Sequence, residues 1–309
     1  MSDLKVLLTG ARGMVGKNIT DLKPNHIDLY KPAKLELNLL DYVNVKKYIN
    51  TIKPDIVIHA AGIVGGIQAN INHPVKFLRE NMLMAHNLIW ASFELSVPYI
   101  LNLGSSCMYP RNAPNPLKED VVLNGELEPT NEGYALSKIF AQRFCQYINY
   151  EQNNINYKTL IPCNLYGKYD KFDTEWGHMI PSVIQKIHKA KQQNMDEIEI
   201  WGNGEARREF MFSGDFADFV WFAIDHIGQI PELLNVGLGY DYSINEYYKI
   251  IARVVGFNGS FKHNLTKPVG MKQKLVDISR LNQTEWVPKY TLEQGIKETY
   301  DYYLRTINN

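Results

Sequence analysis

The chain of 309 residues lacks a charge excess of either sign. Lys and Arg together number 33, and Asp and Glu also number 33, so the formal net charge is zero. Because no long-range field of one sign surrounds such a protein, composition gives no reason to expect nucleic acid or an anionic membrane as a partner. Any anionic ligand must therefore be held by local geometry.

Cysteine and long hydrophobic runs are also scarce. The three cysteines, Cys107, Cys145 and Cys163, are widely separated and odd in number, which argues against both a disulfide framework and a metal site. No apolar segment reaches the roughly 20 residues that span a bilayer, and the first residues, MSDLKVLLTG, enter a strand pattern without a signal-peptide core. We therefore expect a cytoplasmic protein with no bound metal and no membrane partner.

The first half of the chain alternates short apolar strands with helical segments. Strands are expected at 6–8, 27–30, 56–59, 99–103 and 157–161, and helices at 42–51, 74–95 and 134–151. Strands that are apolar on both faces and alternate with helices predict a parallel sheet covered on both sides. The predicted fold is α/β, a Rossmann-type doubly wound parallel sheet with a smaller C-terminal α/β substrate lobe.

No repeat, low-complexity tract or linker separates the two parts, so we expect them to share a cleft. We predict a cofactor domain at 1–162 with added segments near 209–240. The remaining segments, 163–208 and 241–309, are predicted to form the smaller, substrate-binding lobe. The default ligand site of this architecture lies at the carboxyl ends of the parallel strands.

A glycine-rich stretch follows the first predicted strand. Gly10, Gly13 and Gly16 are spaced by three residues, which allows a tight turn, close approach of the backbone to a pyrophosphate, and packing of the next helix on the sheet. This context predicts a dinucleotide site. The predicted cofactor-binding residues are Gly10, Arg12, Gly13, Met14, Val15, Lys31, Asp41, Ala60 and Ala61, together with Tyr134, Lys138 and His178.

The end of the second strand favours NADPH over NADH. A carboxylate at that point holds a ribose hydroxyl, whereas a cation accommodates a 2′-phosphate. The strand runs into Lys31, with Lys34 nearby and Arg12 in the glycine loop. Asp28 is the competing signal, because a strand that ended two residues earlier would place its carboxylate at the ribose.

Tyr134 and Lys138 form a YxxxK pair one helical turn apart. A free tyrosine titrates near 10 and is a weak acid at neutral pH, but a nearby ammonium stabilises its phenolate. The stretch GSSCMYP, residues 104–110, offers two hydroxyls after the strand at 99–103, of which Ser105 is the preferred partner of Tyr134. Ser106 is then expected to contact substrate.

With these residues the sequence resembles an extended short-chain dehydrogenase/reductase, and more closely the GDP-L-fucose synthase family. The resemblance rests on GSSCMYP, LEPTNEGYALSK (127–138), IPCNLYG (161–167), GHMIPSVI (177–184) and REFMFSGD (208–215), which occur in the family's order across nearly the whole chain. It implies a homodimeric enzyme that epimerises carbons 3 and 5 of a GDP-linked 4-keto sugar and then reduces the ketone with NADPH.

The resemblance also implies catalytic roles. Ser105 and Tyr134 would hold the carbonyl oxygen, Lys138 would hold the nicotinamide ribose, and Cys107 and His178 would transfer the protons of epimerisation. For the remainder of the substrate, matching positions are Asn164, Lys186, Trp201, Arg208 and Lys274. From residue type alone, the preferred reading of Cys107 is a small buried hydrophobe, and Trp201 is also read as a packed core residue.

Two departures from the family pattern concern the substrate. Residues 269–274, VGMKQK, replace a more polar run, and Lys186 stands where an arginine is usual. They leave open the identity of the sugar, with GDP-4-keto-heptoses as the alternative substrates. Two other classes compete: a nucleotide-sugar 4-epimerase that retains NAD, and a regulatory dinucleotide-binding protein, which the presence of both Tyr134 and Lys138 disfavours.

Overall fold

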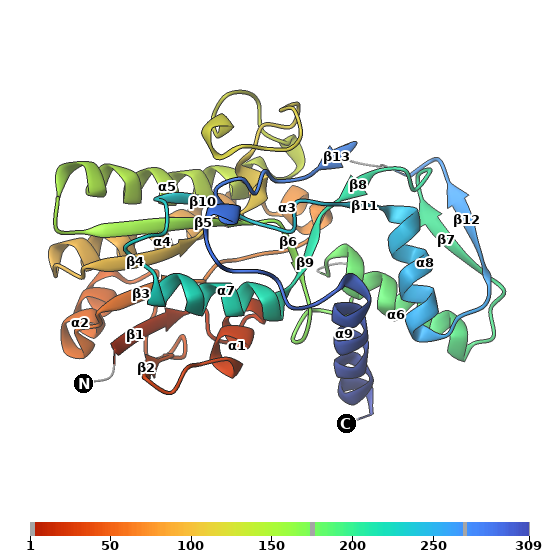
Figure 1. Cartoon of the computed structure of the whole chain (residues 1–309), viewed down its shortest axis with the longest axis horizontal. Helices are drawn as coiled ribbons and strands as arrows, with labels where there is room; N and C mark the ends of the chain where they lie inside the picture. Colours follow the sequence, from red (N-terminus) through yellow and green to blue (C-terminus); the bar gives the residue numbers. More distant parts are fainter. Residues whose placement is uncertain (1–3, 174–176, 268–270, 309) are drawn as a thin grey trace.

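The computed structural model describes residues 4–173, 177–267 and 271–308. It has a large lobe built on one sheet and a smaller lobe beside it (Figure 1). Of the run at 269–274, Val269 and Gly270 lie outside the described residues. No helix of the described residues is long and apolar enough to cross a bilayer.

The large lobe contains a six-stranded parallel sheet in the order β10-β5-β4-β3-β1-β2. Its strands are β1 (Leu4–Thr9), β2 (Ile27–Tyr30), β3 (Ile56–His59), β4 (Tyr99–Leu103), β5 (Asn156–Pro162) and β10 (Leu233–Val236). The predicted doubly wound α/β fold is confirmed. The five strands expected in the first half are all present, and β10 comes from the predicted segment near 209–240.

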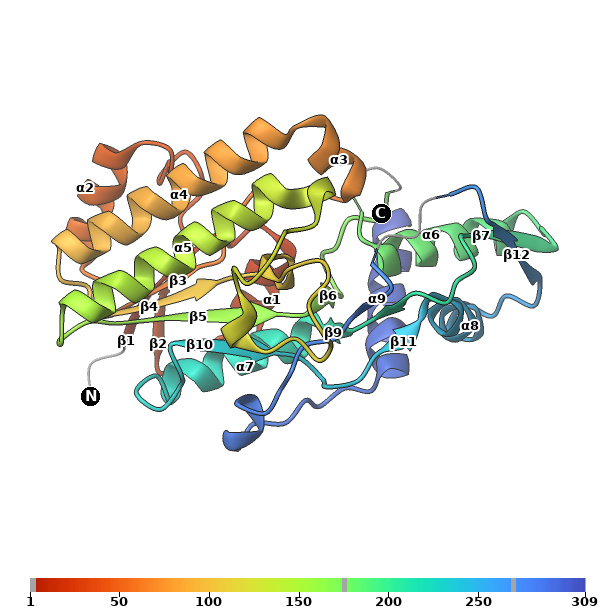
Figure 2. The same cartoon turned by 90° about the horizontal axis from the view of Figure 1, so that it is seen from above.

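Helices cover both faces of this sheet (Figure 2). One face carries α2 (Tyr42–Ile52), α4 (Pro74–Glu94) and α5 (Glu132–Glu151), and the other carries α1 (Met14–Asp21) and α7 (Ser213–Asp225). The alternation within β1 explains this arrangement, because Val6 and Leu8 enter the core under α1 and α7, whereas Leu7 enters the core under α2, α4 and α5. A short helix, α3 (Ile67–Asn72), precedes α4.

The smaller lobe has its own core. Its helices are α6 (Met179–Gln192), α8 (Ile244–Val255) and α9 (Leu292–Ile307). Capping boxes start two of them, at Ser243 with Glu246 and at Thr291 with Gln294, and Gly256 ends α8 in a left-handed conformation. Their buried faces share a core that includes Ile184, Ile251 and Ile296.

Three small sheets complete this side of the molecule. They pair β12 (Ser260–Asn264) with β7 (Glu197–Trp201), β6 (Asn164–Tyr166) with β9 (Phe210–Phe212), and β8 (Arg207–Arg208) with both β11 (Tyr242–Ser243) and β13 (Gln273–Lys274). Short 3₁₀ turns are η1 (Ser106–Met108), η2 (Glu119–Val121), η3 (Pro129–Asn131) and η4 (Leu281–Gln283).

The predicted domain boundaries stay a prediction, but part of the C-terminal segment packs in the core of the large lobe. Val276, Leu281 and Trp286 are buried in the large-lobe core, although they fall in the segment 241–309 that was assigned to the smaller lobe. The Trp286 indole donates to Asp218 on α7 at 2.9 Å. The chain therefore returns to the large lobe before it enters α9.

Candidate active site

The glycine loop lies where the sheet order reverses. β1 has β2 on one side and β3 on the other, so the carboxyl ends of β1 and β3 flank a topological switch point. Gly10 has a φ of +73°, and a Cβ there would lie 2.6 Å from the amide nitrogen of Ala61. A Cβ on Gly16 would lie 2.3 Å from the Gly10 carbonyl oxygen. The loop, the helix and the end of β3 thus meet at contact distances that only glycine allows.

The N-terminus of α1 fits a dinucleotide diphosphate. Gly13 caps the helix without a side-chain hydrogen bond, and within the described chain the amides of Met14 and Val15 have no backbone acceptor. Free amides and the positive end of the helix dipole at a glycine loop suit phosphate oxygens. These features agree with the cofactor site predicted at Gly10, Gly13, Met14, Val15, Ala60 and Ala61.

The second strand ends as the NADPH prediction requires. β2 extends to Tyr30, so Lys31 directly follows its carboxyl end and Asp28 lies inside the strand. Asp28 hydrogen-bonds to Tyr30, which raises the pKa of that phenol. Arg12 and Lys31 are both exposed. Asp41 has a separate local role, because its carboxylate accepts the Asn44 amide at 3.1 Å and caps α2.

Ser105, Tyr134 and Lys138 converge beyond the end of β4. Burial and the neighbouring Cys107 raise the pKa of the Tyr134 phenol well above its ordinary value, and the nearby Ser105 hydroxyl opposes this rise. Lys138 donates from Nζ to the Leu103 carbonyl at 2.8 Å and lies 5.8 Å from the centre of the Tyr134 ring. Burial lowers the pKa of Lys138 to about 8. Ser106 is buried.

Cys107 lies beside this group. It is half-buried and packs with Tyr134 and Phe77, whereas Cys145 and Cys163 are buried. Its sulfur accepts from the Asn131 amide nitrogen at 3.2 Å and from the Lys274 ammonium at 3.6 Å. The thiol is therefore part of a polar cluster with a phenol and two ammonium groups nearby.

His178 precedes α6 as its N-terminal cap residue. Burial, together with the charges of Lys171 and Lys274, lowers the pKa of its imidazole. Lys274 links the two residues to which proton transfer was assigned, because it contacts the sulfur of Cys107 and acts electrostatically on His178.

The predicted substrate residues fall into two groups. Arg208 lies beside Lys274 in the β8–β13 pair, and Asn164 on β6 donates to the Glu209 carbonyl at 2.8 Å. Lys186 and Trp201 lie further along the smaller lobe. The Lys186 ammonium donates to the Glu199 carbonyl of β7 at 2.5 Å, and Trp201 is 55% exposed rather than packed in a core.

Two residues at the site were missed by sequence reasoning. Asn131 contacts Cys107, and nothing in its residue type marks it apart from its place in the quoted stretch LEPTNEGYALSK. Glu209 is fully buried, and its carboxylate accepts the amides of Leu238, Gly239 and Val276 at 2.5, 2.9 and 2.9 Å. Burial raises its pKa to about 7. It joins β8 to the strand that carries Lys274, and no sequence pattern indicates such a long-range contact.

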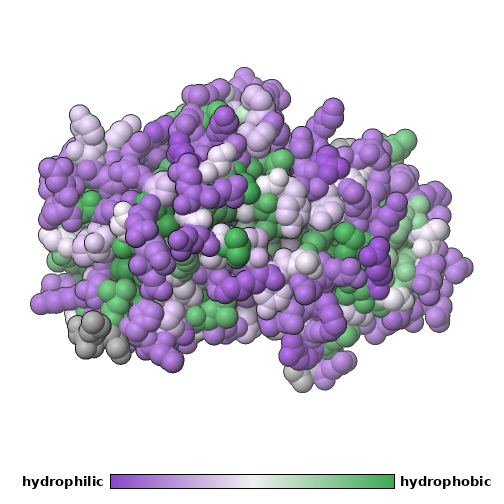
Figure 3. Space-filling view, in the orientation of Figure 1, coloured by the Kyte–Doolittle hydropathy of each residue, from purple (hydrophilic) through white to green (hydrophobic). Residues whose placement is uncertain are grey.

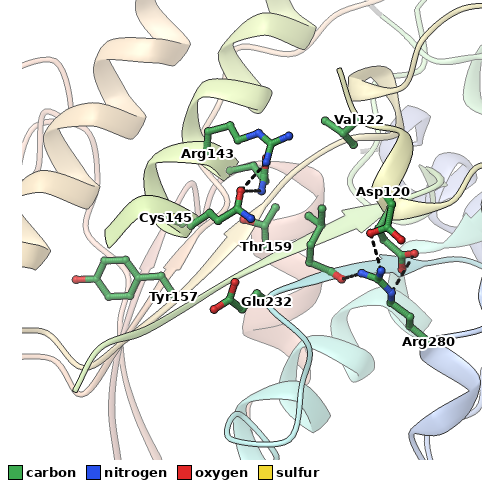
Figure 4. Close-up of a pocket in the computed structure, with 12 residues that line it drawn as sticks. Asp120, Val122, Arg143, Cys145, Tyr157, Thr159, Glu232 and Arg280 are labelled. Atoms are coloured by element: carbon green, nitrogen blue, oxygen red, sulfur yellow. Dashed lines mark hydrogen bonds and ion pairs between the residues drawn. The ribbon is translucent and has the colours of Figure 1, made fainter. Parts of the chain in front are cut away.

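A separate cavity of about 310 Å³ opens between α5, β5 and β10 (Figure 4). None of the predicted site residues lines it. Its Arg280 is already paired with Asp120 at 2.7 Å and Glu119 at 3.6 Å. Among the described residues no group of three or more His, Cys, Asp or Glu side chains is placed to hold a metal ion.

Comparison with known proteins gives concordant results. Residues 6–237 match the NAD dependent epimerase/dehydratase family. The chain is 52% identical to GDP-L-colitose synthase of Yersinia pseudotuberculosis over 99% of this chain and 100% of the relative. It is 48% identical to GDP-L-fucose synthase of Azorhizobium caulinodans, over 97% of this chain and 96% of the relative.

The fold is also similar to that of a solved structure. A GDP-mannoheptose C4 reductase from Campylobacter jejuni with NADP bound superimposes with a TM-score of 0.89 at 29% identity, covering 98% of this chain and 99% of the other. The chain therefore belongs to the NAD dependent epimerase/dehydratase family and, within it, to the NADPH-dependent oxidoreductases of the GDP-L-fucose synthase family.

Proposed function

We propose that this enzyme reduces the 4-keto group of a GDP-linked keto-sugar with NADPH and epimerises carbons 3 and 5 of the same sugar. The observation that carries the proposal is the convergence of Ser105, Tyr134, Lys138 and Cys107 beyond the end of β4. A reductase needs the first three groups, whereas the thiol is needed only if protons also leave carbon.

In reduction the protein supplies an acid and a fixed position for the ketone. NADPH, when bound through the glycine loop, supplies the hydride. Ser105 and Tyr134 donate hydrogen bonds to the carbonyl oxygen, and Tyr134 gives that oxygen its proton. The Lys138 ammonium, which lies near the ring of Tyr134, stabilises the phenolate that remains.

In epimerisation the ketone makes its neighbouring C–H bonds acidic. A base removes the proton, the electron pair is delocalised as an enolate, and an acid returns a proton from the opposite face. We assign these transfers to Cys107 and His178. The same hydrogen bonds from Ser105 and Tyr134 would stabilise the enolate oxygen, so both reactions share one site.

The nucleotide part of the substrate is assigned to the smaller lobe. Arg208 and Lys274 supply cations for the diphosphate, Asn164 contacts the sugar, and Lys186 with Trp201 provides a charge and an exposed aromatic face further along the lobe. These local cations account for binding of an anionic ligand by a protein of zero net charge.

The preferred sugar is a GDP-4-keto-6-deoxymannose type, giving GDP-L-fucose or a related GDP-sugar. The names of the relatives, GDP-L-fucose synthase and GDP-L-colitose synthase, support this class. Reduction of a GDP-4-keto-heptose is the second candidate, favoured by structural neighbours that are GDP-heptose reductases. The sequence feature that supports a heptose substrate is Lys186, which stands where an arginine is usual in the family.

The test is turnover with each candidate sugar. The purified protein is mixed with NADPH and with GDP-4-keto-6-deoxymannose, the keto precursor of GDP-L-colitose, or a GDP-4-keto-heptose, and absorbance at the nicotinamide band is followed. Loss of absorbance with one sugar supports the proposal and identifies the substrate by its rate. Interconversion without net NADPH consumption would instead indicate a 4-epimerase, and no turnover with any of them would refute the proposal.

We further propose a homodimer in the cytoplasm. The outer surface of α4 and α5 carries a connected set of aromatic rings, in which Trp90 stacks with Phe144 at 6.2 Å and Phe140 lies 5.6 Å from Phe144. Tyr147 and Tyr150 are exposed on the same helix. Two such helix pairs would bury these rings around a two-fold axis. Three free thiols favour a reducing compartment.

A further inference from the structure

The sulfur of Cys107 has two nitrogen donors that come from different parts of the fold. Asn131 belongs to η3 and precedes α5 in the large lobe, and its side-chain nitrogen lies 3.2 Å from the sulfur. Lys274 belongs to β13 in the small sheet with β8, and its Nζ lies 3.6 Å from the sulfur. Both distances are normal for hydrogen bonds to sulfur, so two elements far apart in sequence meet on one atom.

Asn131 has a further property that sets it apart. Its other side-chain atom, Oδ1, is buried and has no hydrogen-bond partner among the described residues. A buried amide oxygen without a donor costs free energy of folding. The side-chain nitrogen is directed at Cys107 and donates to its sulfur, and such a donor stabilises a negatively charged sulfur.

We propose that Asn131 and Lys274 are positioning residues for Cys107, which hold its sulfur from two lobes and stabilise the negative charge that it carries during proton transfer. The inference rests on the proposed epimerase function. It also gives Lys274 a role at the thiol, in place of a role confined to the substrate diphosphate.

Proton transfer requires a negative charge on the Cys107 sulfur, whether the sulfur takes a proton from the sugar or gives one to it. If the thiolate takes the proton, the C–H bond breaks, an S–H bond forms and the electron pair enters the enolate. If the thiol gives the proton, the S–H bond breaks and its electron pair remains on sulfur. In both cases the thiolate is one end state, and N–H donors, one of them charged, stabilise it.

The charged and titratable groups that face the sulfur are few. Tyr134 and Lys138 face it from α5, and Lys274 faces it from β13. Lys138 donates a hydrogen bond to the Leu103 carbonyl and also interacts electrostatically with Cys107. Lys274 also helps to lower the pKa of His178, so a single ammonium acts on both proton-transfer residues.

Alkylation of the folded full-length protein tests the inference without any substrate. Iodoacetamide reacts with thiolates, and Cys107 is the half-buried cysteine while Cys145 and Cys163 are buried, so the early reaction reports on Cys107. Rates are measured from pH 6 to pH 10 by mass spectrometry of the peptide that contains Cys107.

Lys274→Met should slow alkylation at pH 7 by about fivefold or more and change the rate at pH 10 little, because it removes the ammonium that contacts the reacting sulfur. Asn131→Asp should slow alkylation more than Lys274→Met does, because a carboxylate replaces the side-chain nitrogen that donates to the sulfur. Lys274→Arg, which retains the charge, should recover most of the rate.

Lys272→Met is the matched control, since it removes an exposed lysine two residues away on the same segment. Its alkylation rate should stay within twofold of that of the unmodified protein.

Solvent deuterium incorporation gives the second measurement. With an accepted keto-sugar, Lys274→Met and Asn131→Ala should lose deuterium incorporation at carbons 3 and 5 more strongly than NADPH oxidation. If Lys274 acts only on the diphosphate, Lys274→Met will raise KM and leave alkylation unchanged. Unchanged alkylation in both Lys274→Met and Asn131→Asp would overturn the inference even if the enzyme turns over. Failure of every sugar would refute the proposed function alone, because alkylation is read without substrate.

Discussion

Tyr134 and Lys138 show how burial sets the chemistry of single residues. The phenol is 9% exposed and its pKa is raised, so it is fully protonated at neutral pH and ready to donate. Burial has the opposite effect on Lys138, which holds its ammonium at a pKa of about 8. The pair therefore combines a protonated phenol with an ammonium that is close to losing its charge.

The hydroxyl of Tyr134 is expected to be the acid of the reduction. Tyr134→Phe should lower kcat for NADPH oxidation by about 10²- to 10⁴-fold, the usual contribution of a positioned acid. Tyr109→Phe is the matched control, because the Tyr109 hydroxyl binds Asn235 at 2.6 Å inside the core. That control should lose stability and retain most of its activity; equal activity losses in the two variants would contradict the assignment.

The pKa of Lys138 predicts a direction of pH dependence. Below about pH 8 the side chain is charged and stabilises the phenolate, and above it the charge is lost. The reduction rate at saturating substrate should therefore fall by about tenfold for each pH unit well above 8. A pH–rate profile checks this, and a rate that is level from pH 7 to pH 10 would show that the ammonium is not needed.

At the scale of elements, the site depends on a contact between the glycine loop, α1 and β3. Gly10 and Gly16 lie at the contact points, where the backbone of the loop packs directly against the backbone of α1 and of the residues that follow β3, and leaves no room for side chains. The spacing of the glycines predicted this close packing, and the distances in the structure predict what an added methyl group would do.

Gly16→Ala should disrupt NADPH binding and destabilise the fold, because its Cβ would lie 2.3 Å from a backbone oxygen. Gly228→Ala is the control, since a Cβ there has no atom within 4 Å. Thermal unfolding with and without NADPH measures both effects. Gly16→Ala should lower Tm and abolish the increase in Tm that NADPH produces, and a normal NADPH-dependent increase in this variant would contradict the account of the loop.

At the scale of the whole molecule, the exposed apolar residues are spread over many elements. The face seen in Figure 3 is mostly hydrophilic, with hydrophobic residues in small separate groups. The helices α4 and α5 lie side by side on the opposite face of the sheet from α7 (Figure 2). Their aromatic rings are the surface on which the proposed homodimer depends.

Trp90→Glu should convert the proposed dimer to a monomer, because it places a charge among stacked aromatic rings. Light scattering after size-exclusion chromatography measures the mass. Val287→Glu, at an exposed position away from α4 and α5, is the control and should remain dimeric. A monomeric unmodified protein, or a dimeric Trp90→Glu variant, would argue against this interface.

The sequence predicted the strands, the long helices and the glycine loop because these depend on local patterns. The periodic apolar runs placed β1 to β5 within one or two residues, and the YxxxK spacing placed Tyr134 and Lys138 on one helical face. The contacts of Asn131 with Cys107 and of Glu209 with Leu238 and Val276 depend on tertiary packing, which no local spacing records. The catalytic roles themselves remain predictions.

The most direct test combines both proposed reactions in one tube. The enzyme is incubated with GDP-4-keto-6-deoxymannose and NADPH in deuterated water, and the product is analysed by NMR and mass spectrometry. The account predicts a reduced GDP-sugar with deuterium at carbons 3 and 5, and Cys107→Ser should reduce the yield of labelled product sharply. A reduced sugar without deuterium would contradict the epimerase claim, and absence of any reduced sugar from this substrate and its colitose and heptose counterparts would contradict the account as a whole.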